Sequence, residues 1–168
     1  MNAIFSADSE WGIGKDNGLL VRIKDDMKRF KRFTLGKTVV MGHNTYLSLP
    51  GSRALKDRQN IVFSRDRSLS LPDAQIVRSV DELFALVGNG GDVFVIGGAQ
   101  IYSLLLPYCR RAFVTLIEGS LGADVFVENL DKSGDWRLTA FSSPKECDGF
   151  KFKYATYENT RPTPERKA

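Results

Sequence analysis

The order of the apolar segments restricts the possible folds of this chain more than any other feature. Up to residue 106, short runs with the length of buried strands alternate with helical patterns, and only strand patterns follow. Strands that alternate with helices pair in parallel, whereas consecutive strands pair antiparallel. We therefore expect an α/β fold whose mostly parallel sheet is covered by helices on both faces, with antiparallel strands at the edges.

Glycine, proline and capping residues set the expected boundaries. The expected strands are residues 3–7, 38–41, 60–63, 75–77, 93–96, 112–117, 136–141 and 150–157. The expected helices are residues 25–33, 43–49, 80–87 and 99–106, of which the third begins with a capping box, Ser79 and Glu82. We expect a loop at 10–18 and a turn at 89–91. Residues 1–158 should form a single domain, and 159–168 a frayed polar tail.

Composition excludes several classes of protein. The 168 residues are 42% hydrophobic and 26% charged, as in one globular domain, and no apolar run could cross a membrane. The start of the chain lacks the features of a signal peptide, and Cys109 and Cys147 fit neither a metal pair nor a redox dithiol. We expect a cytoplasmic protein without a metal site.

The positive charge of the chain is mild. A net charge of +4 suits anionic small molecules as well as nucleic acid. A nucleic-acid site is expected to interleave basic residues with exposed aromatics, whereas the basic run from Lys28 to Arg32 fits better as the solvent face of an amphipathic helix. We expect no nucleic-acid partner.

Two turns share one construction, a buried strand followed by a glycine and a helix. They are residues 39–45 and 95–100. A helix N-terminus offers unpaired N–H groups, and glycine lets a phosphate approach the backbone. Either turn alone could be only a tight connection. Two in one small domain favour a nucleotide across the sheet edge. Arg65, after a third strand, could reach an extra phosphate on that nucleotide.

Asp26 is an acid on the apolar side of its helix. At 100° per residue it aligns with Phe30 and Phe33, with Met27 beside them. The opposite, solvent-facing side is expected to carry Asp25, Lys28, Arg29 and Arg32. An ionised carboxylate on the apolar side is costly unless it is hydrogen-bonded. Spacing alone leaves two interpretations open, a functional acid or a favourable contact with the helix dipole.

The other reactive residues suggest few alternatives. His43 is the only histidine, no serine occupies a nucleophile elbow, and no ligand cluster suits a metal. One carboxylate, two phosphate-binding turns and many apolar residues suit hydride transfer, where the cofactor supplies the chemistry.

From about Ala3 to Tyr157 the chain closely resembles the dihydrofolate reductase family. The matching residues are Gly12-Ile13-Gly14, Asn17-Gly18, Asp26, Phe30-Lys31, Leu35-Gly36-Lys37, Val39-Val40-Met41-Gly42, Thr45, Arg58-Gln59-Asn60, Ser79-Val80-Asp81, Ile96-Gly97-Gly98, Ile101-Tyr102, Thr115-Leu116-Ile117, Asp124, Phe126 and Trp136. The resemblance implies a three-layer sandwich, with a central mixed, mostly parallel sheet of about eight strands flanked by helices and an antiparallel C-terminal strand pair.

The resemblance also implies the substrate site. Asp26 would be the catalytic carboxylate, binding the 2-amino group and ring N–H of the pterin, and Thr115 would hydrogen-bond Asp26 or the amino group. Arg58 would hold the α-carboxylate of the glutamate tail. The implied substrate-binding residues are Ile4, Phe5, Asp26, Met27, Phe30, Leu49, Leu55, Arg58, Ile96, Tyr102 and Thr115.

The implied cofactor is NADPH. Its implied contacts are Ser6, Ile13, Gly14, Asn17, Gly18, Leu19, Gly42, His43, Asn44, Thr45, Ser64, Arg65, Ile96, Gly97, Gly98, Ala99, Gln100, Ile101 and Tyr102. The resemblance predicts a cis Gly97–Gly98 bond. It implies reduction of 7,8-dihydrofolate for one-carbon metabolism, with hydride transfer from nicotinamide C4 to pterin C6 and protonation at N5 by water. Antifolate inhibitors would bind, and the protein would be a monomer.

The chain departs from the family pattern at several positions. Leu20-Val21 replaces a Pro-Trp pair that holds an ordered water, and Ser6 replaces an alanine. Lys24 replaces the proline that opens the helix, so Asp25 is expected to help begin it. His43-Asn44 stands where an arginine is frequent, and Ala123 replaces a glycine in the loop that supports residues 10–24.

Two other functions remain to be distinguished. A related reductase of riboflavin synthesis shares the cofactor half but generally lacks the Asp26–Thr115 pair. A non-catalytic NADPH-binding protein would have no need of Asp26, Thr115 and Arg58.

Overall fold

The structure is a computed structural model that describes residues 1–88 and 92–163. The strands are β1 (Asn2–Ala7), β2 (Gly12–Lys15), β3 (Gly18–Leu19), β4 (Thr38–Gly42), β5 (Gln59–Phe63), β6 (Gln75–Val77), β7 (Val93–Gly97), β8 (Arg111–Ile117), β9 (Val125–Phe126), β10 (Trp136–Phe141), β11 (Lys145–Cys147) and β12 (Phe150–Asn159). The helices are α1 (Lys24–Thr34), α2 (His43–Ser48), α3 (Val80–Val87) and α4 (Ala99–Leu105), with short 3₁₀ helices η1 (Pro50–Ser52) and η2 (Leu106–Tyr108).

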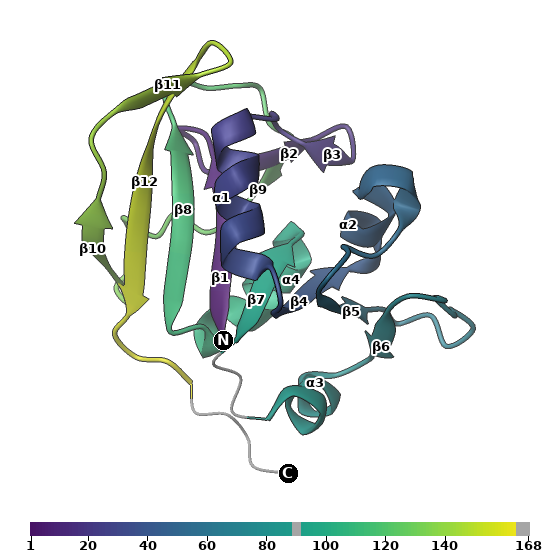
Figure 1. Cartoon of the computed structure of the whole chain (residues 1–168). Helices are drawn as coiled ribbons and strands as arrows, with labels where there is room; N and C mark the ends of the chain where they lie inside the picture. The colour runs from purple at the N-terminus through teal and green to yellow at the C-terminus, as the bar shows by residue number, and fades with distance from the viewer. Residues whose placement is uncertain (89–91, 164–168) are drawn as a thin grey trace.

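The central sheet confirms the expected topology. Its order is β10-β12-β8-β1-β7-β4-β5-β6, and β11 adds to β12. The strands from β8 to β6 are all parallel, whereas β12 runs antiparallel to β8 and to β10 (Figure 1). The predicted closing pair therefore forms one edge of the sheet.

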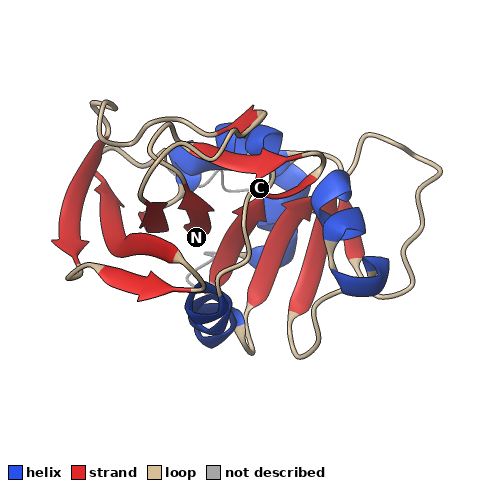
Figure 2. Ribbon diagram, turned by 90° about the horizontal axis from the view of Figure 1, so that it is seen from above, coloured by secondary structure: helices blue, strands red, loops and turns tan. Residues whose placement is uncertain are grey.

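Helices cover both faces of this sheet, which gives three layers (Figure 2). Phe30 of α1 and Tyr46 of α2 pack on one face with Met41 of β4. The neighbouring Val40 points to the other face, where Leu105 of α4 belongs to the larger core. Successive strand residues alternate between the two faces, so the same strands contribute side chains to both cores.

The expected loop at 10–18 contains strands instead. β2 and β3 form a hairpin whose turn residues, Asp16 and Asn17, have φ of 50° and 60°. Short polar residues tolerate this left-handed region, which a two-residue hairpin turn requires. β2 also pairs with β9, so the hairpin at the expected loop and a distant strand together form a small three-stranded sheet.

Two other boundaries differ from expectation. Pro107 lies within η2 rather than ending α4, because a 3₁₀ turn continues the chain. Asn159 is the last residue of β12 and is buried, and the Thr163 N–H donates to the Pro107 carbonyl, so residues 159–163 are not a frayed tail. The expected turn at 89–91 and the rest of the tail, 164–168, lie outside the described residues.

The start of α1 is capped by a distant residue rather than by Asp25. Ile23 occupies the N-cap position without a side-chain hydrogen bond. The Lys24 N–H instead donates to the Asp148 carboxylate over 2.7 Å, from the turn before β12. This hydrogen bond satisfies an N–H group that a proline at the same position would not have.

Candidate active site

The centre of the site is the pair of Asp26 on α1 and Thr115 on β8. The Thr115 hydroxyl donates to Asp26 Oδ1 over 2.5 Å, and Thr115 is fully buried. Burial raises the pKa of the Asp26 carboxyl, while the Thr115 hydrogen bond and the Arg29 charge lower it. Because Asp26 makes no capping bond, its position on the apolar face is accounted for by this partner.

Arg29 was expected on the solvent-facing side of α1, and the structure shows that it is buried. It is 8% exposed, and its Nη1 donates to Thr115 Oγ1 over 3.4 Å. Asp25 and Lys28 do lie on the exposed side, where they form an ion pair. At 100° per residue, three positions place Arg29 only about 60° from Asp26, closer than Met27 at about 100°. The angle could have identified Arg29, whereas its charge suggested solvent exposure.

Most of the predicted apolar substrate residues lie together beside this pair. Ile4, Phe30, Leu49, Leu55 and Ile96 belong to one cluster on the α1 face of the sheet. This arrangement provides an apolar wall next to a single carboxylate.

Three of the predicted substrate residues lie elsewhere. The Phe5 side chain points to the opposite face, where its ring is 4.9 Å from that of Tyr102 and 6.4 Å from that of Trp11. The buried Tyr102 hydroxyl donates to the Ile4 carbonyl over 2.9 Å. Met27 is 39% exposed and belongs to neither core. Phe5 and Tyr102 therefore support the strand beneath the site.

Arg58 is held in place by its own neighbours. Its Nε donates to Thr34 Oγ1 over 2.9 Å, and its Nη1 to the Lys56 carbonyl. Asn60 bonds both the N–H and the carbonyl of Leu55 and so fixes the same segment. A guanidinium oriented in this way is suited to bind a carboxylate with its remaining donors.

The two predicted phosphate turns lie side by side at the carboxyl ends of adjacent parallel strands, β4 and β7. A Cβ on Gly98 would lie 3.4 Å from Thr45 Oγ1, and one on Gly42 would lie 3.1 Å from Ile101 Cγ1. The Gly97–Gly98 bond is cis, as predicted. Glycine therefore lets the two turns approach each other closely, and their main-chain groups form a cradle that suits a dinucleotide phosphate.

Several of the remaining predicted cofactor residues lie on elements next to the two turns. The hairpin of β2 and β3, which carries Ile13 to Leu19, lies against α2. The His43 ring stacks on that of Tyr46 at 6.5 Å. Ser64 and Arg65 follow β5, the neighbour of β4.

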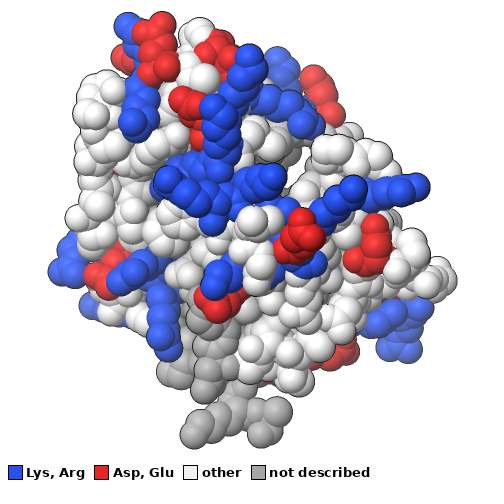
Figure 3. All heavy atoms as spheres, in the orientation of Figure 1, with Lys and Arg blue, Asp and Glu red and all other residues white. Residues whose placement is uncertain are grey.

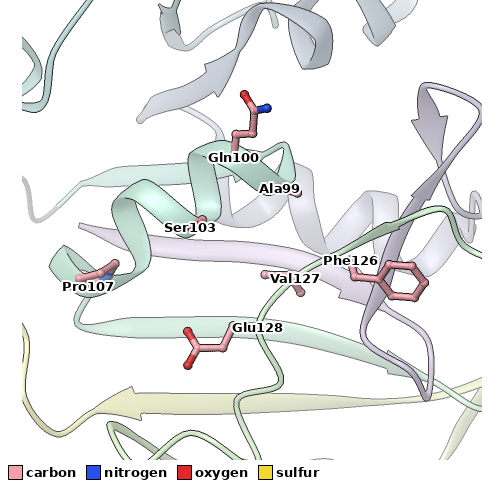
Figure 4. Close-up of a pocket in the computed structure, with 7 residues that line it drawn as sticks. All are labelled: Ala99, Gln100, Ser103, Pro107, Phe126, Val127 and Glu128. Carbon is pink, nitrogen blue, oxygen red and sulfur yellow. The ribbon is translucent and has the colours of Figure 1, made fainter.

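One surface pocket includes two of these residues. It has a volume of about 380 Å³ and lies between α4 and the segment after β9 (Figure 4). Its lining residues are Ala99, Gln100, Ser103, Pro107, Phe126, Val127 and Glu128. It does not contain Asp26, so it is separate from the carboxylate site.

The described part of the chain contains no cluster of three or more potential metal ligands, and none of its helices is long and apolar enough to cross a membrane. Cys109 and Cys147 are free, and burial raises the pKa of the Cys109 thiol to about 12. A thiol protonated at neutral pH is not a nucleophile, and Cys109 fills the core.

A parallel sheet with two glycine turns at one edge, beside a single hydrogen-bonded carboxylate, defines a nucleotide-dependent α/β reductase. Comparison with known proteins gives the particular family. The family model "Dihydrofolate reductase" matches residues 1–159. The chain belongs to the dihydrofolate reductase family and is an oxidoreductase.

Individual relatives agree over nearly the whole chain. Dihydrofolate reductase of Staphylococcus haemolyticus is 33% identical over 165 residues, covering 96% of each chain. The enzyme of Bacillus subtilis is 31% identical and covers 92% of each. A solved structure of dihydrofolate reductase from Enterococcus faecalis, complexed with NADP(H) and RAB-propyl, superposes with a TM-score of 0.83 at 28% identity, covering 94% of this chain and 95% of that one.

Proposed function

We propose that Asp26 anchors the pterin in the reaction of this enzyme, the NADPH-dependent reduction of 7,8-dihydrofolate to 5,6,7,8-tetrahydrofolate. The Thr115–Asp26 hydrogen bond carries this proposal. It fixes one carboxylate oxygen of Asp26 and leaves acceptor capacity for the 2-amino group and ring N–H of the pterin. Each such charge-assisted bond is worth about 1.5–3 kcal/mol.

The neighbouring residues suit the rest of the substrate. The cluster with Ile4, Phe30, Leu49, Leu55 and Ile96 would line the pterin and benzoyl groups, and its position on the same face as Asp26 supports this role. Arg58 would bind the α-carboxylate of the glutamate tail, because Thr34 and the Lys56 carbonyl already orient its guanidinium. Antifolate inhibitors would compete for the same surface.

The cofactor would lie across the glycine cradle. Gly42 to Thr45 and Gly97 to Tyr102 would hold its phosphates, with Ser64 and Arg65 at the 2′-phosphate. When bound, NADPH supplies the hydride that pterin C6 receives while N5 gains a proton. The fit is supported by the close approach of the two turns, which Gly42 and Gly98 allow because they carry no side chain.

Asp26 would orient and polarise the ring rather than pass on the proton. Its carboxylate accepts hydrogen bonds at the 2-amino side, and water would protonate N5. The segment from Glu10 to Lys24, which lies against α2 through β3, would limit access of bulk water and strengthen these bonds.

All the residues assigned to the site come from one chain, so we propose a monomer that acts as a single domain in the cytoplasm. Neither a nucleic acid nor a membrane has a part in this function. Light scattering of the purified protein would test the monomer.

The central test is NADPH consumption on addition of dihydrofolate. Asp26→Asn keeps the shape but removes the charge, and we expect kcat/KM to fall by about 30-fold to 1000-fold, equivalent to about 2–4 kcal/mol. Asp25→Asn is the matched control, since Asp25 is exposed beside Asp26, and it should act like wild type. Equal rates for Asp26→Asn and wild type would refute the role of Asp26, and no consumption by wild type would refute the activity.

A further inference from the structure

Arg29 is the one Lys or Arg that is buried in the described part of the chain. The other basic residues of α1, which are Lys24, Lys28, Lys31 and Arg32, are exposed, and Figure 3 shows Lys and Arg side chains gathered over this helix. Arg29 is excluded from that surface although burial of a guanidinium is costly. Some contact must therefore offset the cost.

Two aromatic rings and one hydroxyl surround the guanidinium. Its central carbon lies 4.4 Å from the ring centroid of Tyr154 on β12 and 5.1 Å from that of Phe33 on α1. Nη1 donates to Thr115 Oγ1 on β8, the strand paired with β12 at Tyr154. Cation–π contacts strengthen when the cation is desolvated, so the rings favour a charged guanidinium here.

Arg29 and Asp26 share a hydrogen-bonding partner, Thr115, but do not form an ion pair with each other. The ion pairs between described residues do not include Arg29. The charged and titratable groups that interact with Arg29 are Asp26 and Arg32 on α1 and Tyr154 on β12, and Tyr154 in turn interacts with Asp25 on α1 and Lys145 on β11. Among them only Asp26 shares the hydroxyl of Thr115 with Arg29.

We propose that Arg29 is a positioning residue for the reduction, which orients the Thr115 hydroxyl and keeps Asp26 ionised for the pterin. A hydroxyl has one proton to donate and can accept with its lone pairs. Because Thr115 accepts from Arg29, its proton is directed to Asp26. This inference rests on the proposed role of Asp26 as the pterin anchor.

An arginine that acts through Thr115 suits this site better than a direct ion pair. A direct bidentate ion pair between Arg29 and Asp26 would occupy both carboxylate oxygens, which the pterin needs. Arg29 is separated from Asp26 by the Thr115 hydroxyl, and its positive charge still lowers the pKa of Asp26. This effect opposes burial, which raises that pKa. Arg29 thus favours the ionised form of Asp26 and leaves the carboxylate available to the pterin.

The test compares Arg29→Met with Arg32→Met. Arg32 lies on the same helix, and its guanidinium lies 5.9 Å from the same Phe33 ring, but it is exposed. The Asp26 carboxyl resonance, identified by its loss in Asp26→Asn, would be titrated by ¹³C NMR in the ligand-free protein. We expect Asp26 to titrate at higher pH in Arg29→Met and unchanged in Arg32→Met.

Kinetics provide the second measurement. In Arg29→Met the acid limb of kcat/KM for dihydrofolate should move to higher pH, with about tenfold lower kcat/KM on that limb than wild type. Arg29→Lys, which keeps the charge, should restore most of the profile. If Arg29→Met does not fold, Arg29→Gln also removes the positive charge, with a side chain that can still donate a hydrogen bond to Thr115.

Two outcomes would overturn the proposal. One is an Asp26 titration that coincides with wild type in both neutral variants, while their thermal stability falls; Arg29 would then only support packing. The other is a titration moved equally by Arg32→Met, which would show a general surface effect. A wild type that does not reduce dihydrofolate would refute the proposed function instead, and the titration of Asp26 would still decide the role of Arg29.

Discussion

Asp8 joins the first loop to the segment that supports it, and its removal gives the sharpest test of how that loop is held. Asp8 follows β1 directly and is 1% exposed. Its carboxylate accepts the N–H groups of Gly12 at 2.9 Å, Glu10 at 3.0 Å and Leu121 at 2.8 Å. Three hydrogen bonds thus converge on one side chain from two loops.

The cost of Asp8→Ala follows from the burial of these donors. The Gly12 N–H is buried and would lose its partner, which costs about 1–3 kcal/mol. The Glu10 and Leu121 N–H groups are partly buried and can recover some hydration, so each adds about 0.5–1.5 kcal/mol. We expect a loss of about 4 kcal/mol, or a Tm lowered by about 8–16 °C.

Urea unfolding of Asp8→Ala measures this cost, and single-turnover hydride transfer measures its effect on the loop. Glu10→Gln is the matched control, because Glu10 joins the same two loops through Ser120, over 2.8 Å at an exposed position. Exposed contacts contribute little, so the control should stay within about 0.5 kcal/mol of wild type. A loss for Asp8→Ala no greater than that of the control would refute the reasoning.

Two further changes test the same region from other directions. A Cβ at residue 12 would lie 2.2 Å from the Ala123 Cβ, so Gly12→Ala should cost about 1–3 kcal/mol by overpacking, and Ala123→Gly in the same chain should restore part of it. Equal losses in both backgrounds, measured by urea unfolding, would contradict this contact. Asp148→Ala should lower the Tm at neutral pH, because the Lys24 N–H loses its acceptor. That hydrogen bond lowers the pKa of Asp148, so its stabilisation is present above about pH 4 and is lost as the pH falls through the lowered pKa; a Tm difference that persists in strong acid would count against it.

The regular elements could be predicted because their signals are local. β6 and α3 have the predicted bounds, and the Ser79 hydroxyl accepts from the Glu82 N–H, which is one of the two hydrogen bonds of the predicted capping box. The Glu82 carboxylate accepts from the Arg78 N–H instead of the Ser79 N–H. The pairing of β2 with β9 could not be predicted in this way. It joins Gly12 to Phe126, and short strands of this kind carry no alternation that would identify a partner so distant in the chain.

The site shows the same division between local pattern and tertiary context. The helical angle placed Asp26 on the apolar side, but spacing could not decide between a functional acid and a dipole contact. The register of β8 supplies the answer, because it places Thr115 beneath α1 and next to Tyr154. Arg29 was assigned to solvent from its charge, whereas its burial is determined by the Phe33 ring on the same helix and by the Tyr154 ring and Thr115 hydroxyl on two neighbouring strands.

The departures from the family pattern in the first loop become consistent once its anchors are considered. Leu20-Val21 lacks the usual Pro-Trp pair, yet Val21 packs with Leu121 against Ile23 and Ile117. The loop is fixed mainly by main-chain groups, through the bonds to Asp8 and through the pairing of β2 with β9. Because main-chain bonds do not depend on the side chains at 20 and 21, these positions can vary while the hairpin stays against α2.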